Sequence, residues 1–199
     1  MKIELIAACG PSAVAAWLFM QPAATSAAVP MQPAYWAQHD EIDYLDNLPR
    51  LYRCDDLYYK YRDVLLRLGA RPGMKIYAYG CVDDRGVTAK VRAHVDLTYA
   101  VPKALPATVS TKSGLRAKLE TVHLKPGYPK SLDSGDCILV KDMSDTVLAS
   151  FSSHIERADP KCSSMHPAQQ QFDLTVQTLI PQPGQSVRGD KPAPGAPNS

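Results

Sequence analysis

The 199-residue sequence has almost no excess of charge of either sign, because 22 lysines and arginines face 20 aspartates and glutamates for a formal net charge of +2. A protein that holds nucleic acid through its phosphates needs a basic excess, so nucleic acid is not an expected partner. The hydrophobic fraction of 45% excludes a wholly disordered chain. The length favours one folded domain.

Charged side chains are missing altogether from residues 5–38. Lys2 precedes an apolar run, and small residues follow that run, which is the pattern of a secretory signal peptide. Ser26 and Ala28 fit the positions just before a cleavage site, so residues 1–28 are predicted to be a signal peptide. An uncleaved membrane anchor is the alternative, although its apolar run is shorter than the roughly 20 residues that span a bilayer.

Cysteine is scarce, and four cysteines stay in the chain once the predicted signal peptide is removed. An even number of cysteines in an exported chain predicts two disulfide bonds. The protein is therefore expected to be periplasmic or secreted, and a membrane is expected as a partner only if the N-terminal segment is retained as an anchor. The four cysteines are Cys54, Cys81, Cys137 and Cys162.

A regular hydrophobic pattern is missing at both ends of the mature chain. Residues 29–46 show none, and we expect an irregular segment there. Residues 181–199 contain five prolines and three glycines with almost nothing apolar. Such a segment cannot bury enough surface to offset the entropy lost on ordering, so it is predicted to be a disordered tail. Folding is expected in a single domain of residues 47–180.

One helix is predicted at the start of this domain. Asn47 can cap it, and Gly69 followed by Pro72 ends it. Apolar residues recur within it at helical spacing and predict one core-facing side, whereas the charged residues between them, such as Lys60, are expected in solvent. The core-facing side consists of Cys54, Leu57, Tyr58, Tyr61, Val64, Leu65 and Leu68.

Strand patterns follow the helix. Apolar and polar residues alternate throughout residues 87–101, which predicts a strand with one buried and one solvent-exposed side. His94 and Asp96 lie on the side predicted to face solvent. The apolar parity changes within residues 115–124, which indicates a bulge. The expected fold class is α+β, with one N-terminal helix packed on a meandering antiparallel β-sheet of about six strands. The predicted strands are residues 75–82, 87–101, 115–124, 137–142, 146–156 and 171–180.

The lengths of the helix and the first strand predict how the cysteines pair. Cys54 lies roughly 22 Å before the end of the helix at 1.5 Å per residue. The strand that ends at Cys81 returns about 20 Å at 3.3 Å per residue. The chain therefore brings Cys81 back beside Cys54, and Cys137 pairs with Cys162 by elimination.

The helix also carries a second stripe, roughly opposite its core-facing side. A helix on a one-layer sheet should be polar there, and Tyr and Arg are favoured at protein interfaces. Two explanations stay open, because residues 29–46 could fold back over the stripe or a partner could bind to it. The stripe consists of Leu48, Tyr52, Asp55, Tyr59, Arg62 and Leu66.

No motif in the sequence specifies a reaction. The glycine-rich phosphate loop, the HExxH pair, the GxSxG elbow and the paired CxxC are all missing, so neither a cofactor nor a metal is expected. The leading hypothesis is an exported, non-enzymatic module that binds a protein or an envelope component through the helix stripe. The alternative is an exported hydrolase whose ionisable groups lie on the polar sheet face, namely His94, Asp96, His123 and His154.

Overall fold

A computed structural model describes residues 30–45, 52–82, 92–106, 115–151, 154–158, 162 and 172–182. Within these residues, six strands form one antiparallel sheet in the order β2-β3-β1-β4-β6-β5, and the expected α+β class is confirmed. The strands are β1 Gln32–Tyr44, β2 Lys75–Tyr79, β3 His94–Ala104, β4 Arg116–Leu124, β5 His154–Ala158 and β6 Leu174–Pro181. The helices are α1 Cys54–Arg67 and α2 Cys137–Thr146, with 3₁₀ turns η1 Ser134–Asp136 and η2 Leu148–Ser150.

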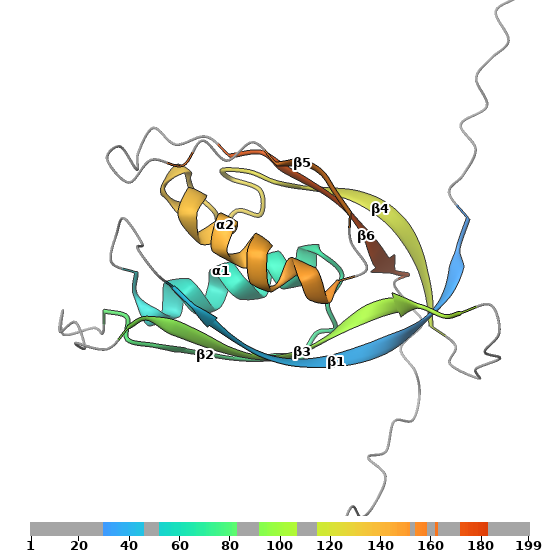
Figure 1. Ribbon diagram of the computed structural model, residues 1–199, viewed down its shortest axis with the longest axis horizontal. Helices are drawn as coiled ribbons and strands as arrows, with labels where there is room; N and C mark the ends of the chain where they lie inside the picture. The colour runs from blue at the N-terminus through green and yellow to red at the C-terminus, as the bar shows by residue number, and fades with distance from the viewer. Residues whose placement is uncertain are drawn as a thin grey trace, which may run out of the picture.

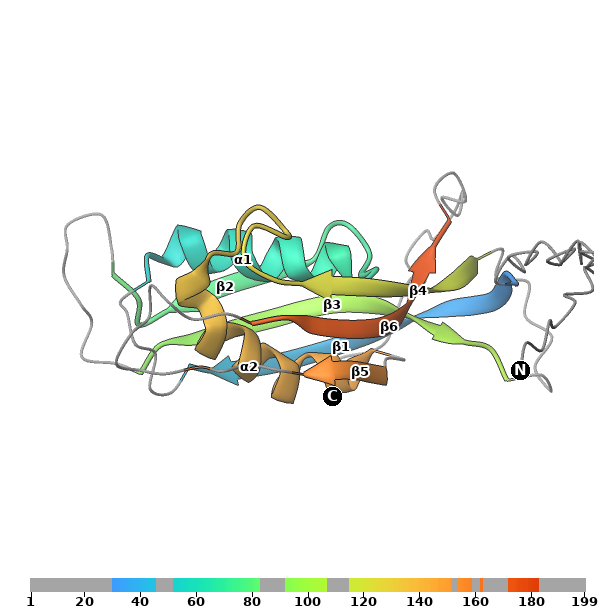
Figure 2. The same cartoon turned by 90° about the horizontal axis from the view of Figure 1, so that it is seen from above.

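The sheet is bent into two arms that enclose both helices. Strand β1 pairs with β3 from Ala34 to Tyr44, but with β4 only at Gln32 and Pro33. We call β2, β3 and β1 the lower arm and β4, β6 and β5 the upper arm. Figure 1 shows α1 and α2 between the two arms, and Figure 2 shows the same arrangement from above, with α1 alongside β2.

One hydrophobic core fills the space between the arms and includes one side of each helix. The alternation predicted for residues 87–101 is confirmed in β3, because its odd-numbered side chains up to Val101 are buried. Residues 83–91, where the preceding turn and the start of this strand were expected, lie outside the described residues. Core members include Leu57 and Leu65 of α1, Val95 and Leu97 of β3, Leu139 and Met143 of α2, and Leu124 and Val176 of the upper arm.

The prediction that residues 29–46 are irregular is wrong, because β1 occupies most of them and lies inside the sheet. The inward positions of β1 include the polar residues His39, Glu41 and Asp43, so the strand has no apolar alternation to reveal it. The helix is therefore not the first element of the fold. Since β1 is paired with β3, it does not fold back over the outer side of α1.

The strand predicted for residues 137–142 is wrong as well, because this segment begins helix α2. A short apolar run does not distinguish a strand from a buried helix. Leu139, Val140 and Met143 follow helical spacing and are all buried. A capping box in which Asp133 and Asp136 satisfy each other's backbone amides starts the preceding turn η1. Of the strand predicted for residues 146–156, only the end lies in β5.

The bulge expected in residues 115–124 is not present in β4, whose pairing with β6 runs without a shift from Ala117 to Leu124. The apolar residues change from odd-numbered to even-numbered positions because each face of this regular strand is buried along a different part of its length. Ala117 packs in a small separate cluster with Ala34 and Leu179, whereas Leu124 packs in the main core. The register shift that does occur lies in β5, between Ile155 and Arg157.

The predicted disulfide pairing is confirmed. The Cα atoms of Cys54 and Cys81 are 5.3 Å apart, and those of Cys137 and Cys162 are 5.4 Å apart. One bond joins the first turn of α1 to the chain just after β2, and the other fixes the first turn of α2. Two disulfide bonds indicate an oxidising environment outside the cytoplasm.

The remaining domain predictions concern the two ends of the chain, a signal peptide and a disordered tail. The predicted signal peptide, residues 1–28, lies outside the described residues, and so does the predicted tail from residue 183 onward. Pro181, which was assigned to that tail, is the last residue of β6. Among the residues that the structure describes, no helix is long and apolar enough to cross a membrane.

Candidate functional site

The stripe predicted on the back of α1 is divided by the structure. Tyr52 is buried, with 4% of its surface exposed, whereas Tyr59 is 54% exposed. Arg62 is exposed, Leu66 is half-buried and Asp55 is exposed beside Arg53, but Leu48 lies outside the described residues. Tyr58 was expected in the core but is 37% exposed, and its ring meets that of Tyr59 edge-on at 5.2 Å. We define the outer α1 face as Tyr58, Tyr59, Arg62 and Leu66.

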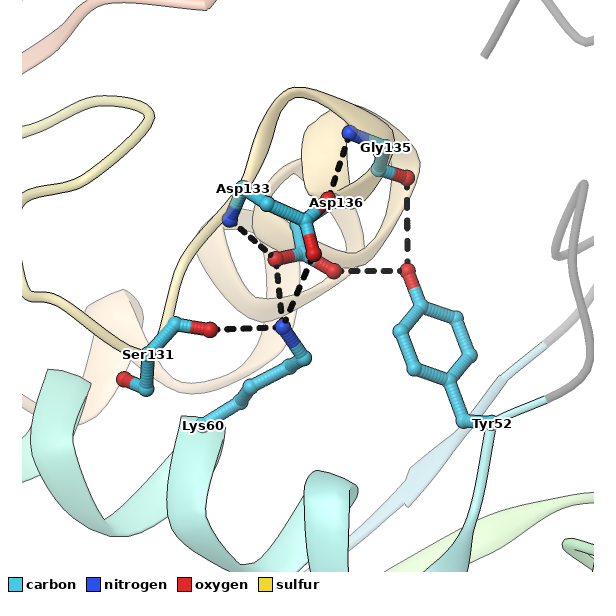
Figure 3. Close-up of polar contacts among 6 residues, drawn as sticks. All are labelled: Tyr52, Lys60, Ser131, Asp133, Gly135 and Asp136. Atoms are coloured by element: carbon cyan, nitrogen blue, oxygen red, sulfur yellow. Dashed lines mark hydrogen bonds and ion pairs between the residues drawn. The ribbon is translucent and has the colours of Figure 1, made fainter. Parts of the chain in front are cut away.

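Tyr52 is drawn inward by a buried polar network that the sequence did not predict. Its hydroxyl lies 2.9 Å from Oδ1 of Asp136, a residue with 0% exposure, and donates to it. The ammonium of Lys60 donates to Oδ2 of the same carboxylate at 2.7 Å and to the carbonyl oxygen of Ser131 at 2.6 Å. Figure 3 shows these groups converging from α1, from Tyr52 just before it and from the loop before α2.

The burial of Lys60 corrects the expectation that this side chain lies in solvent. Its position on α1 faces the loop that carries Asp133 and Asp136, and the Asp133 carboxylate adds a second negative charge at 3.6 Å. A buried ammonium is tolerated when it is paired and hydrogen-bonded in this way. The network fixes the loop on α1 and limits the outer α1 face to the following turns of the helix.

An open groove of about 400 Å³ lies beside the outer α1 face, between α1 and β4. Leu66, Val122 and Ile180 give it apolar walls, and Asp63 and Glu120 add acidic groups. The side chain of Leu66 thus belongs both to the predicted stripe and to a concave surface. Hollow surfaces that combine apolar walls with a few charged groups are typical of binding sites.

Arg67 also lines this groove and is held in place by an aromatic ring. Its guanidinium carbon lies 4.4 Å from the centre of the Tyr128 ring. Nη2 of the same guanidinium group donates a hydrogen bond to the Tyr128 hydroxyl. Arg67 lines the groove together with Pro129, which follows that tyrosine. A positive charge is therefore kept at a groove whose lining also includes the two acidic groups.

The four ionisable groups of the hydrolase hypothesis do not converge. His94 and Asp96 lie on β3 of the lower arm, with 3.9 Å between their nearest side-chain atoms. His123 lies on β4 and His154 on β5, both in the upper arm. Because the helices separate the two arms, these groups belong to at least two distant surfaces (Figure 1).

A second buried polar cluster joins β1 to the helices. The hydroxyl of Tyr61 donates to Oδ2 of Asp43 at 2.5 Å, and Asp43 is only 1% exposed. The hydroxyl of Tyr99 donates to Glu41 at 2.7 Å and lies 2.5 Å from the hydroxyl of Ser150. The spacing of Glu41 and Asp43, two residues apart in a strand, was the signal that could have revealed a polar inner face.

Two carboxyl groups, those of Asp43 in this cluster and Asp142 on α2, have raised pKa values. Burial raises the pKa of Asp43, although hydrogen bonds from Tyr61 and Thr146 oppose that rise. Burial, followed by the negative charge of Asp43, raises the pKa of Asp142 on α2 to about 6. Among the described residues, no group donates a hydrogen bond to Oδ1 of Asp43 or to Oδ2 of Asp142. The negative charge of Asp43 thus disfavours the ionised form of Asp142.

Stability is expected to depend on pH through Asp142. Its pKa is about 6 in the folded protein and 3.8 as the ordinary value, so the folded state binds this proton more tightly. The resulting stabilisation is complete below the ordinary value and is lost as the pH rises through about 6. We expect Asp142→Asn to raise the urea midpoint at neutral pH, but not in acid. The measurement is the urea midpoint across this pH range for both proteins.

Asp55→Asn is the matched control for this experiment. Asp55 is exposed, and its pKa is lowered, chiefly by the hydrogen bond from Arg53. Its contribution to stability therefore has the opposite sign and is lost as the pH falls. If Asp142→Asn and wild-type protein gave the same pH profile, the pKa of Asp142 would not be raised in the folded protein.

Metal ligands and known relatives give no further guide to the site. Across the described ranges, no group of three or more His, Cys, Asp or Glu side chains is placed to hold a metal ion. No protein-family model, curated protein or solved structure matches the chain. The positions and chemistry of the described residues are therefore the basis for assigning a function.

Proposed function

We propose that this chain is an exported, non-enzymatic module, periplasmic or secreted, that binds a protein partner through the outer α1 face and the adjacent groove. The observation that carries the proposal is the position of Tyr59, which is 54% exposed on the same stripe of α1 as Arg62 and Leu66, and Leu66 lines the groove. Exposed tyrosine and arginine next to a concave apolar surface are the residues that most often dominate the energy of protein interfaces.

The chemistry of the groove favours a protein over a small apolar ligand. Its apolar walls can receive an apolar side chain from a partner, while Arg67, Asp63 and Glu120 offer charges of both signs to the partner's polar groups. Such a mixture of an apolar centre and a polar rim is typical of non-obligate interfaces. A protein partner is therefore preferred to another envelope component.

Export of the protein is supported by two independent features. The sequence of residues 1–28 has the pattern of a cleaved signal peptide. Two disulfide bonds suit an oxidising compartment. The hydrolase alternative has less support, because a catalytic site requires its groups within hydrogen-bond reach, and His94, His123 and His154 are divided between the two arms.

The proposal predicts that Tyr59 is dispensable for folding but needed for binding. An exposed side chain truncated to alanine costs within about 0.5 kcal/mol of stability, yet an interface anchor costs about 2 kcal/mol or more of affinity. Tyr61 is fully buried, so Tyr61→Ala is expected to cost about 3–5 kcal/mol of stability. Urea unfolding measures the first quantity, and capture of the partner by immobilised protein measures the second.

Tyr35→Ala serves as the matched control, because Tyr35 is also an exposed tyrosine but lies on β1, away from α1. We expect Tyr35→Ala to retain the partner that Tyr59→Ala loses. If Tyr59→Ala destabilised the fold as much as Tyr61→Ala does, or kept the partner at full affinity, the outer α1 face would not be the binding surface.

A further inference from the structure

The outer side of the lower arm carries an exposed row of aromatic rings. His94 of β3 pairs in register with Tyr44 of β1 on one side and with Tyr79 of β2 on the other. The ring centroids are 5.7 Å apart for Tyr44 and His94 and 5.1 Å apart for Tyr79 and His94. The stack crosses all three strands of this arm, so the rings brace one another on one face of the sheet.

The next outward row continues this apolar surface. Ile42 and Tyr77 flank Asp96 in register and are 52% and 55% exposed. The residues between the two rows, including Val95, face the core instead, because successive side chains of a strand alternate. We call this surface the outer lower-arm face and define it as Ile42, Tyr44, Tyr77, Tyr79, His94 and Asp96.

Large apolar groups gathered on one exposed face mark an interaction site, because a soluble monomer rarely exposes them together. Four of the six residues of this face are large, apolar or aromatic, and at least 46% exposed. The face lies on the side of the lower arm away from α1 and α2 (Figure 1), and it is distinct from the outer α1 face.

The charges beside this face are arranged symmetrically. Lys75 of β2 and Asp40 of β1 both pair with Thr98 of β3 and are exposed. The positive and the negative group therefore lie on opposite sides of the same central strand. Consider a second copy related by a rotation of 180° about an axis that is parallel to β3 and lies in the plane between the two copies. This rotation places β1 of each copy opposite β2 of the other. Asp40 then lies opposite Lys75 at two symmetric points, and Tyr44 lies opposite Tyr79 at two more.

The geometry points to a second copy of this chain as the occupant of the outer lower-arm face. A two-fold interface requires a surface that complements itself. The flanking Lys75 and Asp40 meet this requirement, and the central Asp96, which the rotation places opposite its own copy, lies 3.9 Å from the His94 imidazole. Two sheets packed face to face with nearly aligned strands are a standard way to bury such surfaces. Because the face is only three strands wide, the dimer belongs to the weaker class whose assembly depends on concentration.

Sedimentation of the mature protein from micromolar to millimolar concentration tests this proposal. We expect a monomer–dimer equilibrium for wild-type protein. Lys75→Asp places two acidic groups opposite each other and is expected to weaken the dimer at least about tenfold. The double variant Lys75→Asp with Asp40→Lys restores opposite charges across the interface, so it is expected to recover the dimer.

The control variant is Tyr59→Ala, which alters only the outer α1 face and is expected to leave the dimer unchanged while losing the partner. The proposal of a dimer and the proposed function are therefore tested by different measurements, and either one can be wrong without the other. A monomer at every concentration would overturn the proposal. A dimer insensitive to Lys75→Asp, or one that the double variant does not rescue, would overturn it as well, because the copies would then meet through another surface.

Discussion

Replacing Asp136 with alanine is expected to lower the free energy of unfolding by about 3–5 kcal/mol, because it leaves a buried charge without its closest counter-charge. The carboxylate accepts hydrogen bonds from Lys60 at 2.7 Å, Tyr52 at 2.9 Å and the backbone amide of Asp133 at 2.6 Å. Figure 3 shows the three donors approaching the Asp136 carboxylate from different directions. The measurement is urea unfolding followed by circular dichroism.

Replacing both Lys60 and Asp136 separates the cost of leaving one buried charge unpaired from the contribution of the ion pair itself. Lys60→Met with Asp136→Leu removes both buried charges and keeps similar volumes, so the double variant is expected to be more stable than Asp136→Ala. Asp55→Ala is the control for an exposed ion pair, and it is expected to leave the urea midpoint nearly unchanged. Equal costs for Asp136→Ala and Asp55→Ala would show that the network does not hold the loop on α1.

Removal of either disulfide bond is expected to cost about 2–5 kcal/mol of stability. The paired residues are separated by 27 positions for Cys54 and Cys81, and by 25 for Cys137 and Cys162. Loop-closure entropy depends on the logarithm of loop length, so the two losses should be similar. The measurement is urea unfolding of the two double-alanine variants.

Reduction of wild-type protein provides the control, because it opens both loops and should cost more than either double variant. A double variant as stable as wild-type protein would show that its bond does not restrain the unfolded chain. If only the Cys54–Cys81 variant lost stability, the bond to Cys162 would not contribute to the fold.

The sequence was a good guide where the fold depends on apolar periodicity. The alternation along β3 predicted which side chains are buried, and the matched lengths of helix and strand predicted the Cys54–Cys81 pair. It was a poor guide to β1, because Glu41 and Asp43 occupy inward positions that are normally apolar. The hydroxyl groups that make this possible come from Tyr61 and Tyr99, far along the chain.

The candidate site was predicted only in part for the same reason. Helical spacing placed Tyr59 and Tyr52 on one stripe, and the structure leaves Tyr59 exposed but buries Tyr52. Asp136, which binds Tyr52 and Lys60, lies 84 and 76 positions away from them. Local spacing cannot report a contact over such a distance. The groove was missed as well, because β4 supplies one of its walls.

The outer α1 face is the surface through which we propose that a protein partner binds. The most direct test is photo-crosslinking in producing cells, with a benzophenone amino acid placed at Tyr59 in one strain and at Tyr35 in another. Both residues are exposed, so neither replacement should disturb the fold. We expect light to give a discrete adduct with another protein from position 59 but not from position 35. No adduct from position 59, or the same adduct from both positions, would show that the outer α1 face is not the binding surface.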